Sequence, residues 1–443
     1  MMGALASRLE ARFGLHARGS SISREAMGGL SSFMAAAYLV VVIPGLLAHG
    51  GIDRAAATTA TILVMVAGSM AMGAFANFPF IVGPGLGGAA ILGVTLGQVE
   101  HVPWQAGLGI AMCSGLLFLA LTLSGGRQYI VRLVPPSIKV GLGASIGLFI
   151  ALLGCRDAGM VAVNAKAGAL ALGDFSQAGP IVALIGLGVA VALQGRRIPG
   201  AVLGGILAAT IAGIPLGLTT LHGAAVALPR GIAANAGQVD LRAALDLAAL
   251  PYLFAFFAGE FFSTLGTTLA VGAKAELTDE QGNLPGIGKP FMIDALAATL
   301  GPVIGIPAGT VLVESAVGVE AGGRTGLTAI FAALLFLATL LFTPLAMAIP
   351  KQATAPALIL IGVSMLGTLR HAASHAAEDL LPTILMVLVT LISNSFGTGI
   401  AAGIVSYVLV RLLSGRWRDL SPGLVLLAIP LAYYFIVAAT ARH

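Results

Sequence analysis

The sequence predicts an all-α polytopic membrane protein, and three observations support this fold class. Hydrophobic residues make up 58% of the 443 residues and charged residues only 9%, whereas a soluble domain carries about 25% charged residues. The 60 glycines lie within apolar runs and follow no fixed period, as membrane helices allow because small residues let helices approach closely. The net charge of +5 is spread over many short loops, which excludes a nucleic-acid-binding patch.

Fifteen apolar segments follow one another along the chain. They cover residues 28–48, 55–75, 81–97, 104–124, 135–154, 178–194, 199–217, 248–271, 290–304, 309–321, 324–346, 353–369, 381–394, 397–413 and 421–440. A straight helix needs about 20 residues to cross the hydrocarbon core. We therefore expect 81–97, 290–304, 309–321 and 381–394 to cross with the help of non-helical backbone or to cross only halfway. Segment 421–440 is an additional crossing or an interfacial helix.

The distribution of Lys and Arg predicts the orientation. If the N-terminus is cytosolic and the first fourteen segments each cross once, the inner loops hold sixteen Lys and Arg residues and the outer loops six, with Arg442 left out. This asymmetry follows the positive-inside rule. It predicts a multi-pass protein of the plasma (inner) membrane with a cytosolic tail at residues 1–27.

Internal repetition falls at two pairs of segments. NFPFIVGPGLGGAA precedes the third segment and LGPVIGIPAGTVLVES the tenth, each as a Pro/Gly-interrupted extended piece before a short helix. The fifth and twelfth segments also resemble each other. Interrupted segments at corresponding places in two halves indicate a transporter site at the interface of inverted repeats. Ordinary helix breaks are the alternative interpretation.

Two acidic residues within apolar segments stand out, and neither has a Lys or Arg in the same segment. Glu260 is in the middle of LPYLFAFFAGEFFSTLGTTLAVGA, and Glu314 follows the second extended piece in GTVLVESAVGVEAGG. A carboxylate at the bilayer centre costs at least ~2.5 kcal/mol, and burial favours its protonated form. Both residues are therefore candidates for proton coupling and for binding the N–H edge of a planar heterocycle. Alternatively, they are structural carboxyl groups that bridge helices.

Other polar residues carry weaker signals. Ser263 and Thr264 lie on or next to the helix face of Glu260. His371 and His375 have the spacing of a metal pair, but an amphipathic surface helix explains them better. Cys113 and Cys155 are read as small hydrophobic residues. The sequence contains no nucleotide-binding loop, catalytic triad or zinc motif, so we expect no enzyme, no cofactor and no metal.

Several longer motifs resemble one family. ESAVGVEAGGRTGLTAI, FTPLAMAIPKQATAPALILIGVSML and SREAMGGLSSFMAAAYLVVVIPGLLAHGG are similar to stretches of the AzgA-like hypoxanthine/guanine/adenine permeases, a branch of the xanthine/uracil permease superfamily. The similarity runs from about residue 23 to 413. The resemblance implies fourteen transmembrane segments as seven-plus-seven inverted repeats in core and gate domains, proton symport, and substrate held between the third, eighth and tenth segments. A homodimer is implied by analogy.

The resemblance also assigns residues to the site. Glu314 matches the family's tenth-segment glutamate, a substrate ligand. In the eighth segment Glu260 replaces the first aspartate of the family pattern, and Ser263 replaces the second, which is the substrate-binding acid. The third segment contributes Gly87 and has Ala89 in place of an asparagine. Thr310 lies just before the tenth-segment acid, where the family has a serine and threonines. Thr264 is the last of the predicted ligands.

The predicted organisation has seven parts. They are a tail (1–27), core segments (28–124), gate segments (125–217), an external loop (218–247), core segments (248–346), gate segments (347–413) and a C-terminal apolar segment (414–443). We expect proton-coupled uptake of a purine base by an elevator-like mechanism. A carrier of another heterocycle, a ureide or an organic anion is the alternative. A membrane enzyme built on His371, His375, Glu378 and Asp379, and a sensor that transports nothing, are weaker alternatives.

Overall fold

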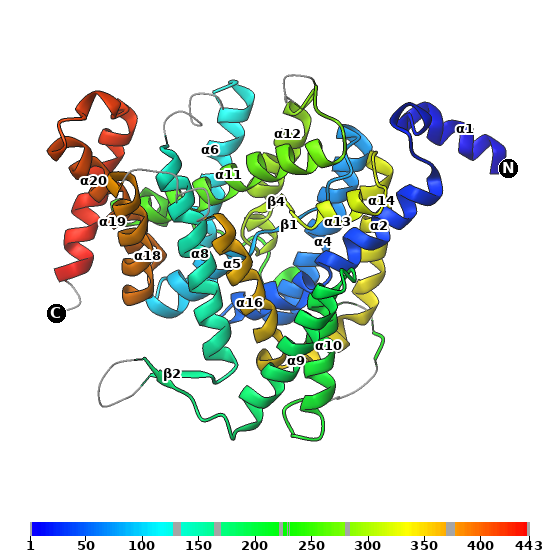
Figure 1. Ribbon diagram of the computed structural model, residues 1–443, viewed down its shortest axis with the longest axis horizontal. Coiled ribbons are helices and arrows are strands. Elements are labelled where there is room, and N and C mark those ends of the chain that lie inside the picture. The colour runs from blue at the N-terminus through cyan, green and yellow to red at the C-terminus, as the bar shows by residue number, and fades with distance from the viewer. Residues whose placement is uncertain are drawn as a thin grey trace.

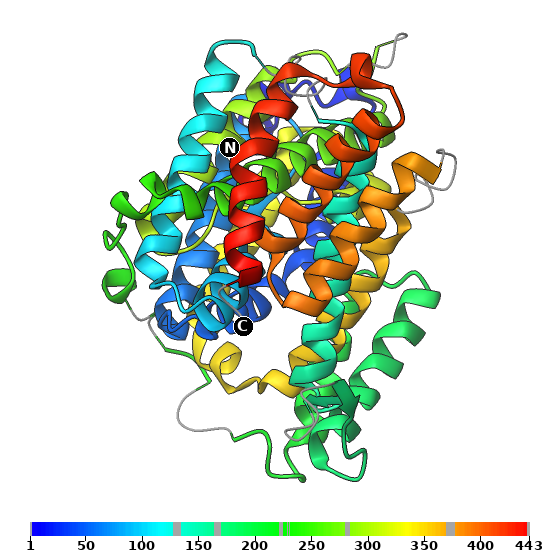
Figure 2. The same ribbon diagram turned by 90° about the vertical axis from the view of Figure 1, so that its left-hand side faces the viewer.

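A computed structural model describes residues 2–126, 134–163, 170–220, 225–227, 229, 231–279, 284–368 and 377–440. Helix accounts for 74% of the structure. The two ends of the chain lie on opposite flanks, and the C-terminal helix stands at the edge that faces the viewer in Figure 2 (Figures 1 and 2).

The first half of the chain contains helices α1 to α10 and three strands. Their bounds are α1 Met2–Phe13, α2 Ile22–Ala36, α3 Leu39–Ala48, α4 Arg54–Ala71, β1 Val82–Pro84, α5 Leu86–Ala90, α6 Trp104–Leu123, α8 Pro136–Asp157, β2 Val161–Val163, β3 Leu170–Leu172, α9 Ala178–Gly195 and α10 Ala201–Gly213. Helix α4 continues as a π-helical turn to Ala76, and α5 continues in π form to Val99. The strands β2 and β3 pair with each other beyond the end of α8.

The second half contains helices α11 to α20 and one strand. Their bounds are α11 Leu250–Lys274, α12 Gly288–Leu300, β4 Gly309–Val311, α13 Ser315–Glu320, α14 Gly326–Thr339, α15 Thr343–Ala348, α16 Lys351–Met365, α18 Ala377–Ser393, α19 Phe396–Leu413 and α20 Pro422–Thr440. The break between α18 and α19 falls at Asn394 and Ser395.

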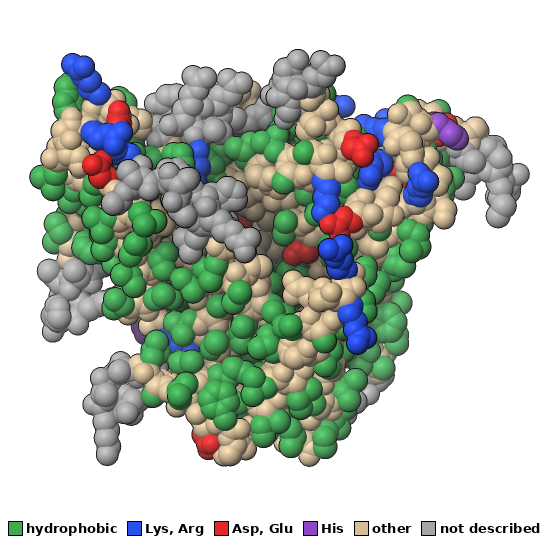
Figure 3. All heavy atoms as spheres, in the orientation of Figure 1, with side chains coloured by type: hydrophobic (Ala, Val, Ile, Leu, Met, Phe, Trp, Pro, Cys, Tyr) green, Lys and Arg blue, Asp and Glu red, His purple; other side chains and the backbone are tan. Residues whose placement is uncertain are grey.

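Every apolar segment predicted from the sequence contains a helix in the structure. Eight helices among the described residues are long and apolar enough to cross a membrane, including Ile22–Ala48, Arg54–Ala76, Pro136–Asp157 and Leu247–Lys274, and shorter apolar helices accompany them. Hydrophobic side chains cover much of the face in Figure 3, while charged side chains gather toward its upper edge and right side. This supports a multi-pass membrane protein. The number of fourteen crossings stays a prediction.

The extended pieces predicted before the third and tenth segments are confirmed. Strands β1 and β4 pair antiparallel in the middle of the helices, with Gly83 opposite Thr310 (Figure 1). Extended backbone within a membrane must find partners for its N–H and C=O groups. The Ser69 hydroxyl accepts a hydrogen bond from the Val82 N–H at 2.9 Å, and the Ser315 hydroxyl accepts one from the Ile81 N–H at 3.0 Å. Side chains of neighbouring helices therefore complete the short sheet.

The helices pack in two groups. Helices α2, α3, α4, α6, α11, α12 and α14 contact one another, and α8, α9, α10, α16, α18 and α19 form the other set of contacts. We call them the first and the second helix group. Their members come from the segments that the sequence assigns to core and gate, although the domain boundaries themselves stay a prediction.

Candidate functional site

A cavity of about 260 Å³ lies beside the paired strands, between the two helix groups. The first group contributes Glu260 and Ser263 from α11, and the second contributes Ile146, Ile361 and Met365 from α8 and α16. Pockets for drug-sized ligands span about 300–1,000 Å³. The cavity therefore suits a single small ring system with apolar walls and a few polar groups.

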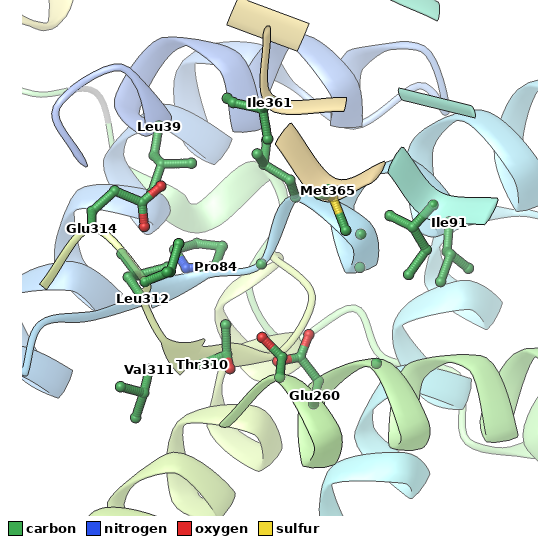
Figure 4. A pocket seen from close by; sticks show the side chains of 18 of the residues that line it. Leu39, Pro84, Ile91, Glu260, Thr310, Val311, Leu312, Glu314, Ile361 and Met365 are labelled. Atoms are coloured by element: carbon green, nitrogen blue, oxygen red, sulfur yellow. The ribbon is translucent and has the colours of Figure 1, made fainter. Parts of the chain in front are cut away.

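The cavity has two acidic positions. Figure 4 shows Glu260 and Glu314 at different sides of the cavity, with Pro84 and Leu312 between them and Ile361 toward the opposite wall. None of the described residues that line the cavity is Lys or Arg. The carboxyl groups therefore have no basic side chain at the cavity surface to balance their charge.

Glu260 belongs to a buried polar cluster. Its carboxyl group lies beside Thr310 of β4 (Figure 4). The Thr310 and Thr264 hydroxyl oxygens are 2.9 Å apart, and Thr264 donates to an Asp294 carboxyl oxygen at 2.5 Å. One further carboxyl oxygen of Glu260 and one of Asp294 are buried without a hydrogen-bond partner. Since a buried polar group without a partner is costly, this cluster has unused capacity for a proton or a ligand.

Glu314 has a different setting. It immediately precedes α13, and its side chain makes no capping bond to that helix. It instead accepts a hydrogen bond from the Tyr38 hydroxyl at 2.6 Å. Tyr38 lies at the break between α2 and α3. The break brings a buried hydroxyl from the first segment to the acid of the tenth.

Glycines leave room for the Glu260 carboxyl group. A Cβ atom on Gly85 would lie 3.1 Å from Glu260 Oε1, and one on Gly88 would lie 3.3 Å from it. These glycines stand at the start of the apolar helix Leu86–Val99. Helix N-termini carry partial positive charge. The Glu260 side chain, which is longer than the aspartate of the family pattern, therefore lies where backbone dipoles favour a carboxylate.

The structure brings most of the predicted ligands together but not all of them. The cavity is lined by Gly87, Glu260, Ser263, Thr310 and Glu314. Thr264 does not line the cavity. Its hydroxyl is hydrogen bonded to Asp294 and Thr310. Ala89 is fully buried and does not line the cavity.

Two residues of the site escaped the sequence reasoning. Tyr38 lies in an apolar run that gives no sign of a helix break. Asp294, in contrast, carries the same signal as Glu260, an acid within an apolar segment, and lies in the predicted segment 290–304. Its partner Thr264 comes from another helix, which spacing along the chain does not reveal.

The predicted surface histidines cannot be placed. His371 and His375 lie outside the described residues. Within the described part of the chain, no group of three or more His, Cys, Asp or Glu side chains has the arrangement of a metal site.

Comparisons with known proteins give a consistent result. Residues 23–405 match the xanthine/uracil permease profile, described as a permease family. The chain is 33% identical over 432 residues to the guanine/hypoxanthine permease GhxP of Escherichia coli O157:H7, with 96% of each chain covered. It is 32% identical over 421 residues to the adenine permease AdeP of Escherichia coli K12, with 95% of this chain and 94% of that one covered. The transmembrane domain of a cyanobacterium bicarbonate transporter, BicA, matches with a TM-score of 0.61 at 16% identity, covering 86% of this chain and 97% of that one. This last likeness concerns the fold alone.

Proposed function

Because this chain belongs to the xanthine/uracil permease family, we propose that it carries a purine nucleobase across the membrane together with protons. It is a permease and not an enzyme, and it is a multi-pass integral membrane protein. The observation that carries the proposal is the small cavity with apolar walls, two acids and no lining Lys or Arg among the described residues.

Recognition of a purine follows from the shape and polarity of this cavity. The ring lies between apolar side chains such as Ile146, Ile361 and Met365. Its N–H edge donates hydrogen bonds to Glu314 and Glu260, since carboxylate oxygens are strong acceptors. Ser263 is exposed to the cavity and offers a hydroxyl that both donates and accepts. Thr310 and the backbone at Gly87 complete the contacts.

Proton coupling follows from the chain of hydroxyl groups behind Glu260. Glu260 and Asp294 are both buried, and two neighbouring buried carboxyl groups cannot both be ionised without a compensating charge. One proton is therefore shared between them through Thr310 and Thr264. When the proton is on Glu260, each hydroxyl points its hydrogen toward Asp294; when it is on Asp294, the chain points the other way. Glu314, which the sequence also predicts to take part in proton coupling, chiefly positions the substrate in this proposal, because the Tyr38 hydroxyl holds its carboxyl group in place.

Transport then requires the site to face each side in turn. In the proposed elevator-like mechanism, the first helix group moves past the second and takes the paired strands with it. The proposal retains fourteen crossings in two inverted halves, a cytosolic N-terminus and the plasma membrane as location. A homodimer remains an expectation of the family resemblance.

Ligand binding to the purified protein tests the proposal. Thermal-shift measurements should compare guanine, hypoxanthine and adenine with pyrimidines, ureides and small organic anions at about pH 6 and about pH 8. We expect stabilisation by at least one purine, dependent on pH, and its loss in Glu314→Gln. If no nucleobase raises the melting temperature but a ureide or an anion does, the purine assignment is wrong.

A further inference from the structure

Two polar contacts join the helix groups on the side of the molecule that carries β2 and β3. His49 follows the last residue of α3, and its Nε2 lies 3.4 Å from Asp157 Oδ1 at the end of α8. Arg54, at the start of α4, donates from Nη2 to the Ile349 carbonyl oxygen at 2.9 Å. His49 and Arg54 belong to the first helix group, whereas Asp157 belongs to the second and Ile349 lies between α15 and α16, two residues before α16 begins. The His49–Asp157 contact therefore crosses the boundary that has to slide during transport, and the Arg54 contact ties the first group to the chain that leads into α16.

These contacts lie well away from the substrate cavity. Tyr38 lines the cavity just before α3, and His49 follows the other end of that helix. At 1.5 Å per residue, the ten residues of α3 separate the two positions by about 15 Å. Ile361 and Lys351 are separated by a similar length of α16. A second cavity of about 320 Å³ opens between the helix groups at this end.

The geometry around His49 favours the doubly protonated ring. Its Nδ1 lies 3.0 Å from the Gly45 carbonyl oxygen, while Nε2 faces Asp157. Both partners are acceptors, and only the imidazolium form has two N–H donors. Consistent with this, the hydrogen bond to Asp157 raises the pKa of His49, with partial burial acting in the opposite direction. His49 is the residue after the candidate span Ile22–Ala48 and lies outside it.

The charged neighbours of His49 come from three elements. Arg156 and Asp157 belong to α8, Lys351 to α16 and Arg54 to α4, and all four line the cavities around the histidine ring. Lys351 lowers the pKa of His49, but less than the contact with Asp157 raises it. Asp157 is the one carboxylate among the described residues that line these cavities. Its contact with His49 therefore joins a carboxylate of the second helix group to a cationic side chain of the first.

We propose that His49 and Asp157, supported by Arg54 and the Ile349 carbonyl, form a latch that keeps the β2–β3 side closed and that a proton on His49 tightens. The inference rests on the proposed function in one respect, because it assumes that the helix groups alternate in their access to the cavity. The latch is fully formed below the ordinary His pKa of about 6.5 and weakens as the pH rises through the raised pKa of His49.

Cysteine accessibility tests the latch without requiring transport. The full chain carries Cys113→Ala and Cys155→Ala, and Ser263→Cys places one thiol in the cavity. A membrane-impermeant maleimide is added to whole cells and, separately, to inside-out vesicles, so that each side of the membrane is sampled alone. The rate of labelling from the β2–β3 side, which the loop charges predict to face outward, is measured at about pH 6 and about pH 8.

We expect labelling from the β2–β3 side to be slower at the lower pH. His49→Gln should raise the rate at the lower pH about fivefold, the upper range for a partly exposed ion pair, and remove its pH dependence. Asp157→Asn should do the same, and the double variant should do no more than either single change. His101→Gln is the matched control, because His101 lies in the short exposed loop before α6, on the same predicted side.

Two results would overturn the latch. One is a labelling rate in both His49→Gln and Asp157→Asn that equals the rate of the unchanged protein. The other is a rise in the labelling rate of His101→Gln as large as that of His49→Gln. Asp157→Asn preserves the shape of the side chain, so it remains informative if His49→Gln does not fold. If the labelling changes as expected but no purine binds, the latch stands and the substrate assignment fails.

Discussion

The two acids of the cavity have contrasting surroundings. Glu260 is backed by Thr310, Thr264 and Asp294, a buried cluster with two carboxyl oxygens that lack partners. Glu314 has a single strong donor, Tyr38, and lies at the start of a short helix. The first setting suits a carboxyl group that gains and loses a proton, and the second suits one held in a fixed position. In the proposed function, proton exchange and substrate positioning are therefore divided between the two sides of the cavity.

The largest effect should come from Glu314→Gln. The amide keeps the shape of the side chain but replaces an acceptor oxygen by an NH₂ group, which faces the substrate N–H edge or the Tyr38 hydroxyl. Losing a hydrogen bond to a charged group and leaving a partner unsatisfied should weaken purine binding about a hundredfold. Isothermal titration calorimetry on purified protein measures this. An affinity within about threefold of the unchanged protein would place substrate recognition elsewhere.

The next effect concerns the pair Glu260 and Asp294. Glu260→Gln and Asp294→Asn should each reduce proton-driven uptake about tenfold and flatten its pH dependence, because either change removes one end of the shared proton path. The double variant should be no worse than either single variant. Uptake into proteoliposomes at a series of pH values measures both effects. Unchanged proton-coupled uptake in Glu260→Gln would refute the role of Glu260.

Tyr38→Phe should have a smaller effect. It removes only the hydroxyl that holds Glu314, so purine affinity should fall about fivefold, less than for a lost direct hydrogen bond to a charged group, while the pH dependence set at Glu260 is kept. Tyr252→Phe is the matched control, since Tyr252 is also buried and hydrogen bonded, to Ser395 and Tyr434, but does not line the cavity. Equal losses in both variants would mean that the effect is one of stability.

Gly88→Ala should have the smallest effect. The added methyl group would lie 3.3 Å from Glu260 Oε1, so the carboxyl group has to shift by a few tenths of an ångström. We expect about a threefold loss of affinity, smaller than usual overpacking costs, because the acid is the end of a flexible side chain that can move. Gly266→Ala, on α11 with open space around it, should have no effect. A loss as large as that of Glu314→Gln would show that Gly88 itself contacts the substrate.

Much of the fold could be predicted from the sequence because lipid imposes simple rules on it. Apolar segments of the required length became helices, and the Pro/Gly-interrupted pieces became β1 and β4 because extended backbone in a membrane needs a partner strand. The break at Tyr38 was not predictable, since the residues around it are as apolar as those of an unbroken helix.

The candidate site could be predicted only in part for a related reason. An acid in an apolar run is visible in the sequence, so Glu260 and Glu314 could be found, and the same criterion applies to Asp294. Contacts between different segments are not visible, so the sequence does not reveal that the Thr264 hydroxyl is hydrogen bonded to Asp294 of another helix. Ala89 is predicted from the family pattern, and in the structure it is fully buried and is not among the residues that line the cavity.

Purine uptake into proteoliposomes under an imposed proton gradient tests the central claim most directly. The purified protein is reconstituted, and accumulation of radiolabelled guanine, hypoxanthine and adenine is followed with the lumen more alkaline than the medium. The proposed function predicts accumulation of at least one purine above its external concentration and its collapse on addition of a protonophore. The proposed function would be contradicted if the purine only reached its external concentration whether or not a proton gradient was present, or if no purine was taken up.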